Sequence, residues 1–267
     1  MLQTMAPGTW RLIVDPPLSG RRNMARDLAL LAGVLETGSP PVLRFYRWDP
    51  PCLSLGRHQD GGTVDTGYCR KMGIDILRRP TGGRAVLHHR ELTYAVVAPL
   101  GRDPFPAAFQ ECYRLVCTAL ARGLRSLGID AELGGGEFTR KMPGPKSPLP
   151  CFQAPAGGEI LVAGRKLVGS AMRVQKGVFL QHGSILLDWD PEVQASSLRS
   201  PDPEALSASI VTIRELAGTP GSIPSLLEHI RAAFSDTMGV VFRESRPSAL
   251  ETETEERILR TRTAFRL

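Results

Sequence analysis

A cysteine and a lysine lie fifteen positions apart in the stretch "CFQAPAGGEILVAGRKLVGSAMR", which spans residues 151–173. Cys151 follows Pro150 at the end of a basic, proline-rich stretch that we expect to form an exposed loop. The thiolate is the nucleophilic form of cysteine, and a nearby cation favours it over the thiol, whose ordinary pKa is about 8.5. Cys151 is therefore a candidate nucleophile with Lys166 as its cation, although most free cysteines are only buried packing residues.

Lys166 lies in "GRKLVGSA", just after a turn and at the start of an expected strand, between Gly164 and Gly169. A rigid strand at that position could aim the ammonium group into a cleft. The alternative is a solvated lysine on a hairpin, because lysine is usually a surface residue.

A second segment, "RRPTGGRAVLHHRELTY" at residues 78–94, combines two glycines and two histidines with several arginines. Its glycines would let the backbone approach a ligand closely, but an ordinary glycine turn with solvated arginines would have the same composition. The segment contains neither a GxGxxG motif nor a GxxxxGK[ST] phosphate loop. His88 and His89, followed by Glu91, do not form HExxH, so we do not expect a metal site.

Composition narrows the class of protein. The five cysteines are an odd number without a CxxC pair, which is typical of reduced thiols. The formal charge of +6 suits an acidic protein partner, and the dispersed basic residues carry no nucleic-acid-binding signature. No stretch approaches the roughly 20 apolar residues of a membrane span, and the N-terminus lacks the layout of a secretory signal. We expect a cytoplasmic protein with one domain over residues 1–267.

Strands and helices alternate along the chain. Hydrophobic periodicity predicts the following strands: 10–14, 41–48, 51–56, 74–80, 84–89, 91–99, and three more between 159 and 190. It predicts the following helices: 21–38, 64–72, 105–127, 203–217 and 222–237. This order indicates an α/β (α+β) fold with a mixed β-sheet flanked by helices, rather than a doubly wound parallel sheet.

Four segments in this order resemble the lipoate-protein ligase, octanoyltransferase and biotin-ligase superfamily: "NMARDLALL", "CLSLGRHQD", the glycine segment and "GRKLVGSAMRVQKGVFLQHGSILL". The resemblance covers roughly residues 10–240 and is strongest to the LipM-type octanoyltransferases. It implies a biotin/lipoate-ligase catalytic-domain fold with an acyl tunnel beneath the glycine loop and with Lys166 on the acyl carbonyl. It also implies a set of substrate-binding residues: Arg79, Thr81, Gly82, Gly83, Arg84, Gly169, Ser170, Ala171 and His182.

The position of Cys151 selects a branch of this superfamily. Its ligases activate a free acid with ATP, whereas its transferases take the acyl group from a thioester through a cysteine. In the LipM type the nucleophile precedes the lysine segment, as Cys151 does, and the chain has no cysteine after Cys151. The resemblance thus implies transfer of octanoyl from acyl carrier protein to the lysine of a lipoyl domain, in a glycine cleavage H protein or a dehydrogenase E2 subunit. No cofactor is expected, and His88 is a candidate for proton transfer.

Three alternatives stay open at this stage. The first is an ATP-dependent lipoate ligase, which would need ATP and magnesium, and the second is an amidotransferase that moves octanoyl between lipoyl domains. The third is a non-catalytic acyl-binding module, against which the presence of both Cys151 and Lys166 argues. The chain departs from the family pattern at Met172, where glutamine is usual, and at His89, where an acidic residue is common.

Overall fold

The structure is a computed structural model that describes residues 8–134, 159–199, 203–219, 221–261 and 265. Cys151 and the basic, proline-rich stretch before it lie outside the described residues.

An eight-stranded mixed sheet forms the centre of the described chain, in the order β11-β1-β2-β6-β10-β9-β8-β7. In sequence order its strands are β1 (Thr9–Val14), β2 (Val42–Tyr46), β6 (Glu91–Pro99), β7 (Glu132–Leu133), β8 (Ile160–Val162), β9 (Arg165–Gln175), β10 (Val178–Leu186) and β11 (Val241–Glu244). The strands β11, β1 and β2 are parallel, and every later pair is antiparallel. The predicted mixed sheet is therefore confirmed.

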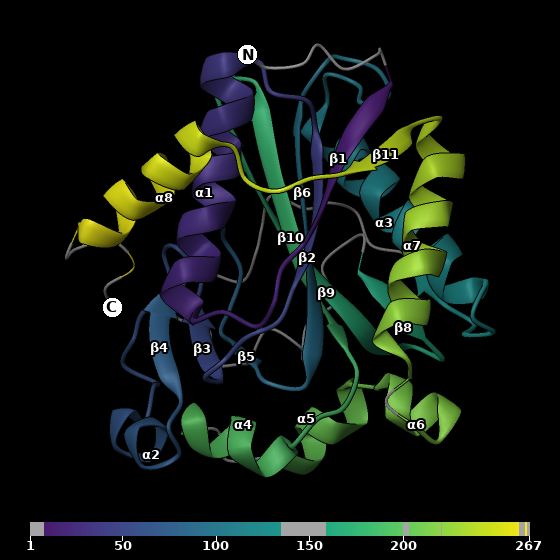
Figure 1. The fold of residues 1–267 in the computed structure, drawn as a ribbon. Helices are drawn as coiled ribbons and strands as arrows, with labels where there is room; N and C mark the ends of the chain where they lie inside the picture. The colour runs from purple at the N-terminus through teal and green to yellow at the C-terminus, as the bar shows by residue number, and fades with distance from the viewer. Residues whose placement is uncertain (1–7, 135–158, 200–202, 220, 262–264, 266–267) are drawn as a thin grey trace.

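Helices cover both faces of this sheet (Figure 1). On one face α1 (Gly20–Thr37) packs against β6 and β10, and α8 (Ala249–Arg260) packs against α1. On the other face α3 (Phe109–Arg125) packs against α7 (Ile223–Met238). Each face buries its own apolar cluster, one containing Leu120 and Phe234 and the other containing Leu30 and Val97. The flanking helices predicted from the sequence are thus present on both faces.

The ends of α1 follow from its sequence. Met24 and Leu31 lie seven residues apart, about two helical turns, so they share one face of the helix, and both are buried. The Ser19 side chain accepts a hydrogen bond from the Arg22 backbone N–H and caps the first turn. Gly38 ends the helix in the left-handed conformation at φ 64°, which glycine adopts without strain. These local signals set the two ends of α1 and the buried face that packs against β6 and β10.

A second sheet of three strands lies beside the first, in the order β4-β3-β5. Its strands are β3 (Cys52–Leu55), β4 (Asp75–Arg78) and β5 (Val86–His88), and the short helix α2 (Thr66–Lys71) connects β3 to β4. Residues 79–85, which we call the glycine loop, connect β4 to β5. The two strands that flank the glycine loop both belong to the second sheet, which therefore fixes the positions of the two ends of the loop.

The predicted helix 203–217 is wrong as one element, because it is divided into α5 (Pro203–Ser209) and α6 (Ile213–Ala217). The Val211 N–H donates to the Lys166 carbonyl oxygen at 3.0 Å, so it is not available for a helical hydrogen bond. The break thus ties this segment to the start of β9.

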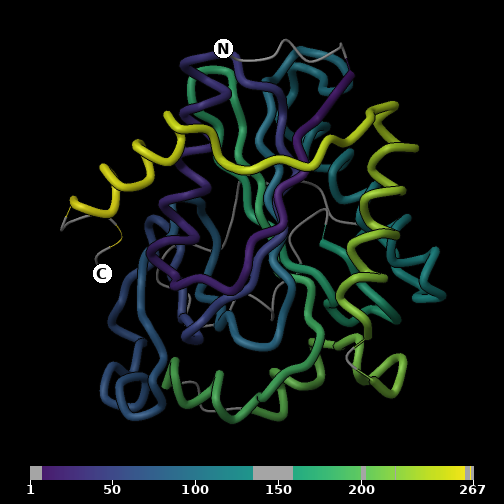
Figure 2. Tube along the Cα trace, in the orientation of Figure 1, coloured from purple at the N-terminus to yellow at the C-terminus, as the bar shows by residue number. Residues whose placement is uncertain are grey.

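Two helices were not anticipated. The helix α4 (Pro191–Ser197) follows β10, and α8 returns the chain to α1 after it has passed along the sheet edge as β11 (Figure 2). Within the described ranges, no helix is long and apolar enough to cross a membrane.

Candidate functional site

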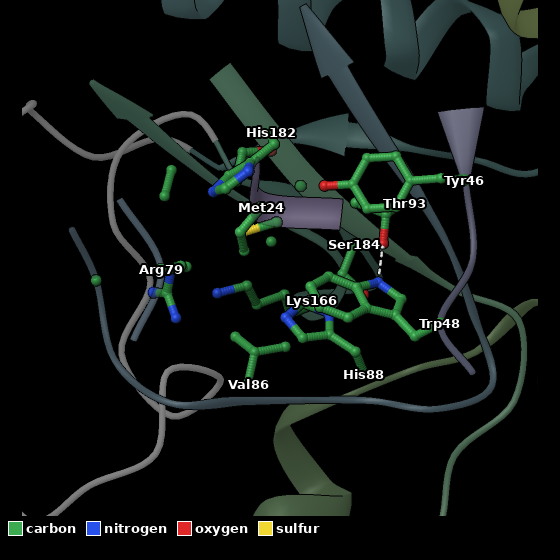
Figure 3. A pocket seen from close by; sticks show the side chains of 15 residues that line it. Met24, Tyr46, Trp48, Arg79, Val86, His88, Thr93, Lys166, His182 and Ser184 are labelled. Atoms are coloured by element: carbon green, nitrogen blue, oxygen red, sulfur yellow. Dashed lines mark hydrogen bonds between the residues drawn. The ribbon is translucent and has the colours of Figure 1, made fainter. Parts of the chain in front are cut away.

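A pocket that opens to solvent lies between the glycine loop, β9 and β10, and its volume is about 490 Å³ when the solvent at its mouth is included (Figure 3). Its apolar lining comes from α1, β2 and β5 together with Trp48, which follows β2. Its polar lining comes from β5, β6, β9, β10 and the glycine loop. The full lining is Met24, Tyr46, Trp48, Arg79, Gly83, Val86, His88, Thr93, Lys166, Gly169, Ser170, Ala171, His182, Gly183 and Ser184. Such a mostly apolar pocket with a few converging polar groups is typical of a small-ligand site.

Lys166 enters this pocket as a buried side chain that is 2% exposed. Its ammonium group forms an ion pair with the carboxylate of Glu159, which is also buried. Its backbone is fixed by the hydrogen bond from Val211 described above. Lys166 is therefore not a solvated lysine on the surface of a hairpin. Its side chain lies inside the pocket, as expected for a strand that aims the ammonium group into a cleft.

Arg79 holds the glycine loop in shape. Its guanidinium donates to the carbonyl oxygen of Gly82 at 2.6 Å, to that of Arg84 at 2.8 Å and to that of Ser54 at 3.0 Å. The guanidinium group is planar and has five N–H donors, so it can bind several backbone carbonyl oxygens at once. Arg79 therefore stabilises the conformation of the glycine loop through these hydrogen bonds. Part of its side chain also lines the pocket.

Gly56 lets the glycine loop approach β3. A Cβ at Gly56 would lie 1.8 Å from the carbonyl oxygen of Gly83, closer than any real Cβ contact. Gly83 itself has a φ of 90°, which disfavours other residues. The close contact therefore requires glycine at position 56, and the backbone conformation favours glycine at position 83.

His182, on β10, connects the loop to α1. Its Nε2 lies 2.6 Å from the Thr81 hydroxyl and its Nδ1 lies 2.9 Å from a carboxylate oxygen of Asp27. Burial lowers the pKa of His182 below its ordinary 6.5, and the neighbouring Asp27 only partly opposes this. His182 is therefore neutral at pH 7.

His88 forms a second array of the same kind. Its Nε2 lies 2.7 Å from the Ser54 hydroxyl, its Nδ1 lies 2.7 Å from Glu91, and its ring stacks on Trp48 at 3.9 Å. Burial raises the pKa of Glu91, but His88 and hydrogen bonds from neighbouring hydroxyls outweigh burial and hold that pKa below 4.5. Both ring nitrogens of His88 thus have protein partners, and its role in proton transfer stays a prediction.

The structure brings together most of the residues predicted from the sequence. Eight of them line the pocket: Arg79, Gly83, His88, Lys166, Gly169, Ser170, Ala171 and His182. Three others lie in the glycine loop outside the lining: Thr81, Gly82 and Arg84. Of these, Thr81 is buried and bonded to His182, whereas Gly82 is exposed. Cys151 lies outside the described residues.

The two departures from the family pattern lie in different surroundings. Met172 is partly buried and packs against the larger apolar cluster, where a thioether fits. His89 is exposed, and it lines a smaller pocket with Asp188 and Asp190. Neither residue lines the main pocket.

Sequence reasoning missed three buried carboxylates around the site: Asp27, Glu91 and Glu159. Asp27 follows Met24 by three positions and so lies on the apolar side of a predicted helix. An acidic residue at such a position is a usable signal, because a buried carboxylate requires a partner. The apolar lining from Met24, Tyr46 and Trp48 has no comparable signal.

The described cysteines are poor nucleophiles. Cys52, Cys69, Cys112 and Cys117 are all buried free thiols. Burial raises the pKa of each, to about 11 for Cys112 and about 12 for Cys117. Among the described residues, no cluster of three or more His, Cys, Asp or Glu could hold a metal ion.

The sequence of this chain is similar to those of known proteins. Residues 19–235 match the model of the lipoyl protein ligase A/B catalytic domain. Octanoyltransferase LipM of Kyrpidia tusciae is 40% identical over 94% of this chain and 95% of its own length. Octanoyltransferase LipM of Brevibacillus brevis is 37% identical over 96% of both chains.

Solved structures give the same result for the fold. The crystal structure of lipoate-protein ligase A bound with ATP has a TM-score of 0.77 and 26% identity, covering 95% of this chain and 94% of that one. The bipartite lipoate-protein ligase of Thermoplasma acidophilum has a TM-score of 0.78 at 24% identity, covering 95% and 92%, and shares the fold. The chain that builds this lysine-containing pocket belongs to the lipoyl protein ligase A/B catalytic domain family.

Proposed function

We propose that this protein is an octanoyltransferase of lipoate biosynthesis. It takes the octanoyl group from acyl carrier protein as a thioester on Cys151 and passes it to the lysine of a lipoyl domain. Its relatives named octanoyltransferase LipM, which align along nearly the whole chain, support this activity.

The observation that carries the proposal is the buried Lys166 ammonium group inside a largely apolar pocket. Met24, Tyr46 and Trp48 offer apolar surface to an acyl chain, and Lys166 offers a cation to its carbonyl oxygen. A preorganised donor in a water-poor site stabilises a developing oxyanion by about 3 kcal/mol.

The reaction proceeds as two acyl transfers. The Cys151 thiolate attacks the thioester carbonyl of the carrier protein, a new S–C bond forms, and the carrier's thiolate leaves. The amine of the target lysine then attacks the acyl-enzyme, the C–N bond forms, and the Cys151 thiolate leaves as the nitrogen loses a proton. Lys166 stabilises the oxyanion of both tetrahedral intermediates and the thiolate between them.

The chemistry of the other thiols supports Cys151 as the nucleophile. A raised pKa keeps a thiol protonated and unreactive near neutral pH, as burial does for the four described cysteines. Cys151 is the remaining cysteine of the five.

The proposal includes no ATP, no metal and no other cofactor, because the thioester already supplies an activated acyl group. The acceptor is a lipoyl domain of a glycine cleavage H protein or of a dehydrogenase E2 subunit. The chain's +6 charge favours encounter with acidic partner domains. We place the reaction in the cytoplasm, where a catalytic thiol stays reduced.

The donor is tested by comparing three reactions with one acceptor domain. We expect transfer from octanoyl-acyl carrier protein without nucleotide. Transfer only from free octanoate with ATP and magnesium would instead identify a ligase, and transfer only from an octanoylated H protein would identify an amidotransferase. Binding of octanoate without any transfer would identify an acyl-binding module.

The nucleophile is tested by omitting the acceptor. We expect a hydroxylamine-labile octanoyl thioester on the peptide that contains Cys151, because the intermediate accumulates when the second substrate is missing. Cys151→Ser should lose this adduct, and Cys112→Ser should keep it. A label on Cys52 or Cys69 would exclude the proposed role of Cys151.

A further inference from the structure

Asp27 lies at the centre of a polar network behind the pocket wall. It is fully buried, on α1, and its carboxylate accepts hydrogen bonds from Arg44 at 2.6 Å and from the Tyr46 hydroxyl at 2.9 Å. Its third partner is Nδ1 of His182, on β10. His182 in turn contacts Thr81 of the glycine loop, so this network runs from the core to the loop.

The donors along this network have one consistent direction. An ionised carboxylate only accepts, so Asp27 requires the hydrogen of His182 to be on Nδ1. The His182 Nε2 is then an acceptor, and the Thr81 hydroxyl must donate to it. The Thr81 carbonyl oxygen accepts from the Arg57 N–H at 2.8 Å, which ties the same residue to the end of β3.

The network continues from Asp27 away from the pocket. Arg44 also pairs with Asp15 at 2.7 Å, and Asp15 pairs with Arg26 at 2.6 Å. Arg26 pairs with Glu255 of α8 at 2.8 Å. Negative and positive side chains therefore alternate from Asp27 to Glu255. At Asp27 itself, Arg44 donates to one carboxylate oxygen and His182 contacts the other.

We propose that Asp27 is a positioning residue for acyl transfer, which acts through His182 to fix the Thr81 hydroxyl and hold the glycine loop over the pocket. The kinetic part of this inference rests on the proposed octanoyl transfer. The geometric part stands independently of it, because it concerns the proton on His182 and the position of Thr81.

The array around His88 serves as an internal control for the array around His182. Ser54, His88 and Glu91 have the same order of hydroxyl, imidazole and carboxylate, and Ser54 accepts from Arg79 at 3.2 Å. In the part of the chain that the structure describes, neither His88 nor Glu91 forms a hydrogen bond or an ion pair with Asp27. A change at Asp27 should therefore alter His182 and leave His88 as it is.

The direct test is ¹⁵N NMR of the histidine rings at pH 7. In Asp27→Asn, Arg44 continues to donate to the side-chain oxygen, so the amide NH₂ takes the place of the oxygen that Tyr46 and His182 share. Its two hydrogens then donate to the Tyr46 hydroxyl oxygen and to Nδ1 of His182. We expect His182 to change from the Nδ1–H to the Nε2–H tautomer, while His88 keeps its spectrum. The His182 signals are assigned by their loss in His182→Gln.

Hydrogen exchange and kinetics test the effect on the loop. The Arg57 amide, which donates to Thr81, should exchange faster in Thr81→Val than in the parent. In Asp27→Asn the His182 Nε2–H still donates to the Thr81 hydroxyl, so the effect on this amide should be smaller. We expect kcat for octanoyl transfer to fall about 10- to 100-fold in Thr81→Val and by less in Asp27→Asn, with KM for the acceptor domain unchanged, because small displacements of a positioned group have costs of this size.

Conservative and distant variants complete the design. Thr81→Ser keeps the hydroxyl and should restore most of the activity and the protection of Arg57. Glu256→Gln changes an exposed ion pair outside the network and should leave tautomer, exchange and kcat at parental values. Thr81→Val leaves Asp27 and Arg44 paired, so it tests the inference even where Asp27→Asn unfolds.

An unchanged His182 tautomer in folded Asp27→Asn would overturn the inference, as would parental kcat and Arg57 exchange in Thr81→Val. If the parent protein transfers no octanoyl group, the proposed function fails. The tautomer and exchange measurements then still decide whether Asp27 positions the loop.

Discussion

The Lys166 ammonium group is buried, and its carboxylate partner Glu159 is what makes that burial tolerable. Lys166→Ala should therefore have two effects. We expect kcat/KM to fall about 100-fold or more, because the acyl oxyanion loses its cation. We also expect the free energy of unfolding to fall by about 3–5 kcal/mol, because Glu159 is left as a buried charge without Lys166.

A double variant separates these effects. Replacing Lys166 with Met and Glu159 with Gln removes both charges, so urea unfolding should show recovered stability while activity stays low. Parental turnover in a folded Lys166→Ala protein would contradict the role of the ammonium group in the reaction.

Thiol reactivity gives a second prediction at the scale of single residues. Burial raises the pKa of Cys112 to about 11 and that of Cys117 to about 12, so both stay thiols at pH 8. Iodoacetamide, followed by peptide mass spectrometry, should modify Cys151 well before either of them. Equal labelling of all five cysteines in the folded protein would contradict both the burial of the four and the activation of the fifth.

At the scale of elements, the glycine loop is positioned by its contact with the end of β3. A Cβ at Gly56 would meet the Gly83 carbonyl at 1.8 Å, so Gly56→Ala must displace the loop. We expect a loss of activity of about 10- to 100-fold, measured as kcat/KM for octanoyl transfer.

Gly61 provides the matched control for this substitution. A Cβ there meets only a methyl group of Leu55, at 4.0 Å, and its φ is not in the left-handed region. Gly61→Ala should therefore leave activity at the parental level. A Gly56→Ala protein as active as Gly61→Ala would show that the loop does not need this close contact.

The elements that the sequence predicted well are those whose apolar spacing matches their burial. The strand at 91–99 has the predicted bounds, and α1 ends at Gly38 as its glycine signal indicated. The helix α8 gave no such signal, because its buried residues are Glu251, Thr254 and Glu255. It docks through ion pairs to arginines of β1 and α1, and a helix held in this way shows no apolar stripe.

The candidate site was predictable to a similar extent and for a similar reason. Lys166 and the glycine loop are marked by glycines, whose positions the sequence displays directly. The helix break near Ile210 and the pairing of Asp27 with His182 depend on contacts between segments far apart in the chain. No local pattern contains that information.

The docking of α8 can be tested with two neighbouring glutamates. Glu255 is 2% exposed in its side chain and pairs with Arg26 and Arg22, whereas Glu256 is 44% exposed and pairs with Arg22. Glu255→Gln should lower the free energy of unfolding by about 1–3 kcal/mol. Glu256→Gln should lower it by less than about 1 kcal/mol, and equal effects would contradict the docking described above.

For the whole molecule, the charged groups that organise the pocket also make folding depend on pH. Burial raises the pKa of Asp27, but Arg44 and His182 outweigh burial, so the folded-state pKa lies below 3.8. Burial lowers the pKa of His182 below 6.5. In each case the unfolded chain binds a proton at a higher pH than the folded protein does, so acid favours unfolding.

The order of these titrations predicts the shape of the stability curve. As pH falls below 6.5, the unfolded chain gains a proton at His182 that the folded protein does not, so the free energy of unfolding should begin to decline. A steeper decline should follow below pH 4.5, where Glu91 and then Asp27 contribute in the same direction. Urea unfolding at a series of pH values measures this curve. His182→Gln should flatten its upper part without abolishing it, since partial desolvation in the smaller pocket, together with Arg90, also lowers the pKa of His89. It should leave the lower, carboxylate part in place, and a parental slope between pH 6.5 and 4.5 in this variant would exclude His182 as a source of the acid sensitivity.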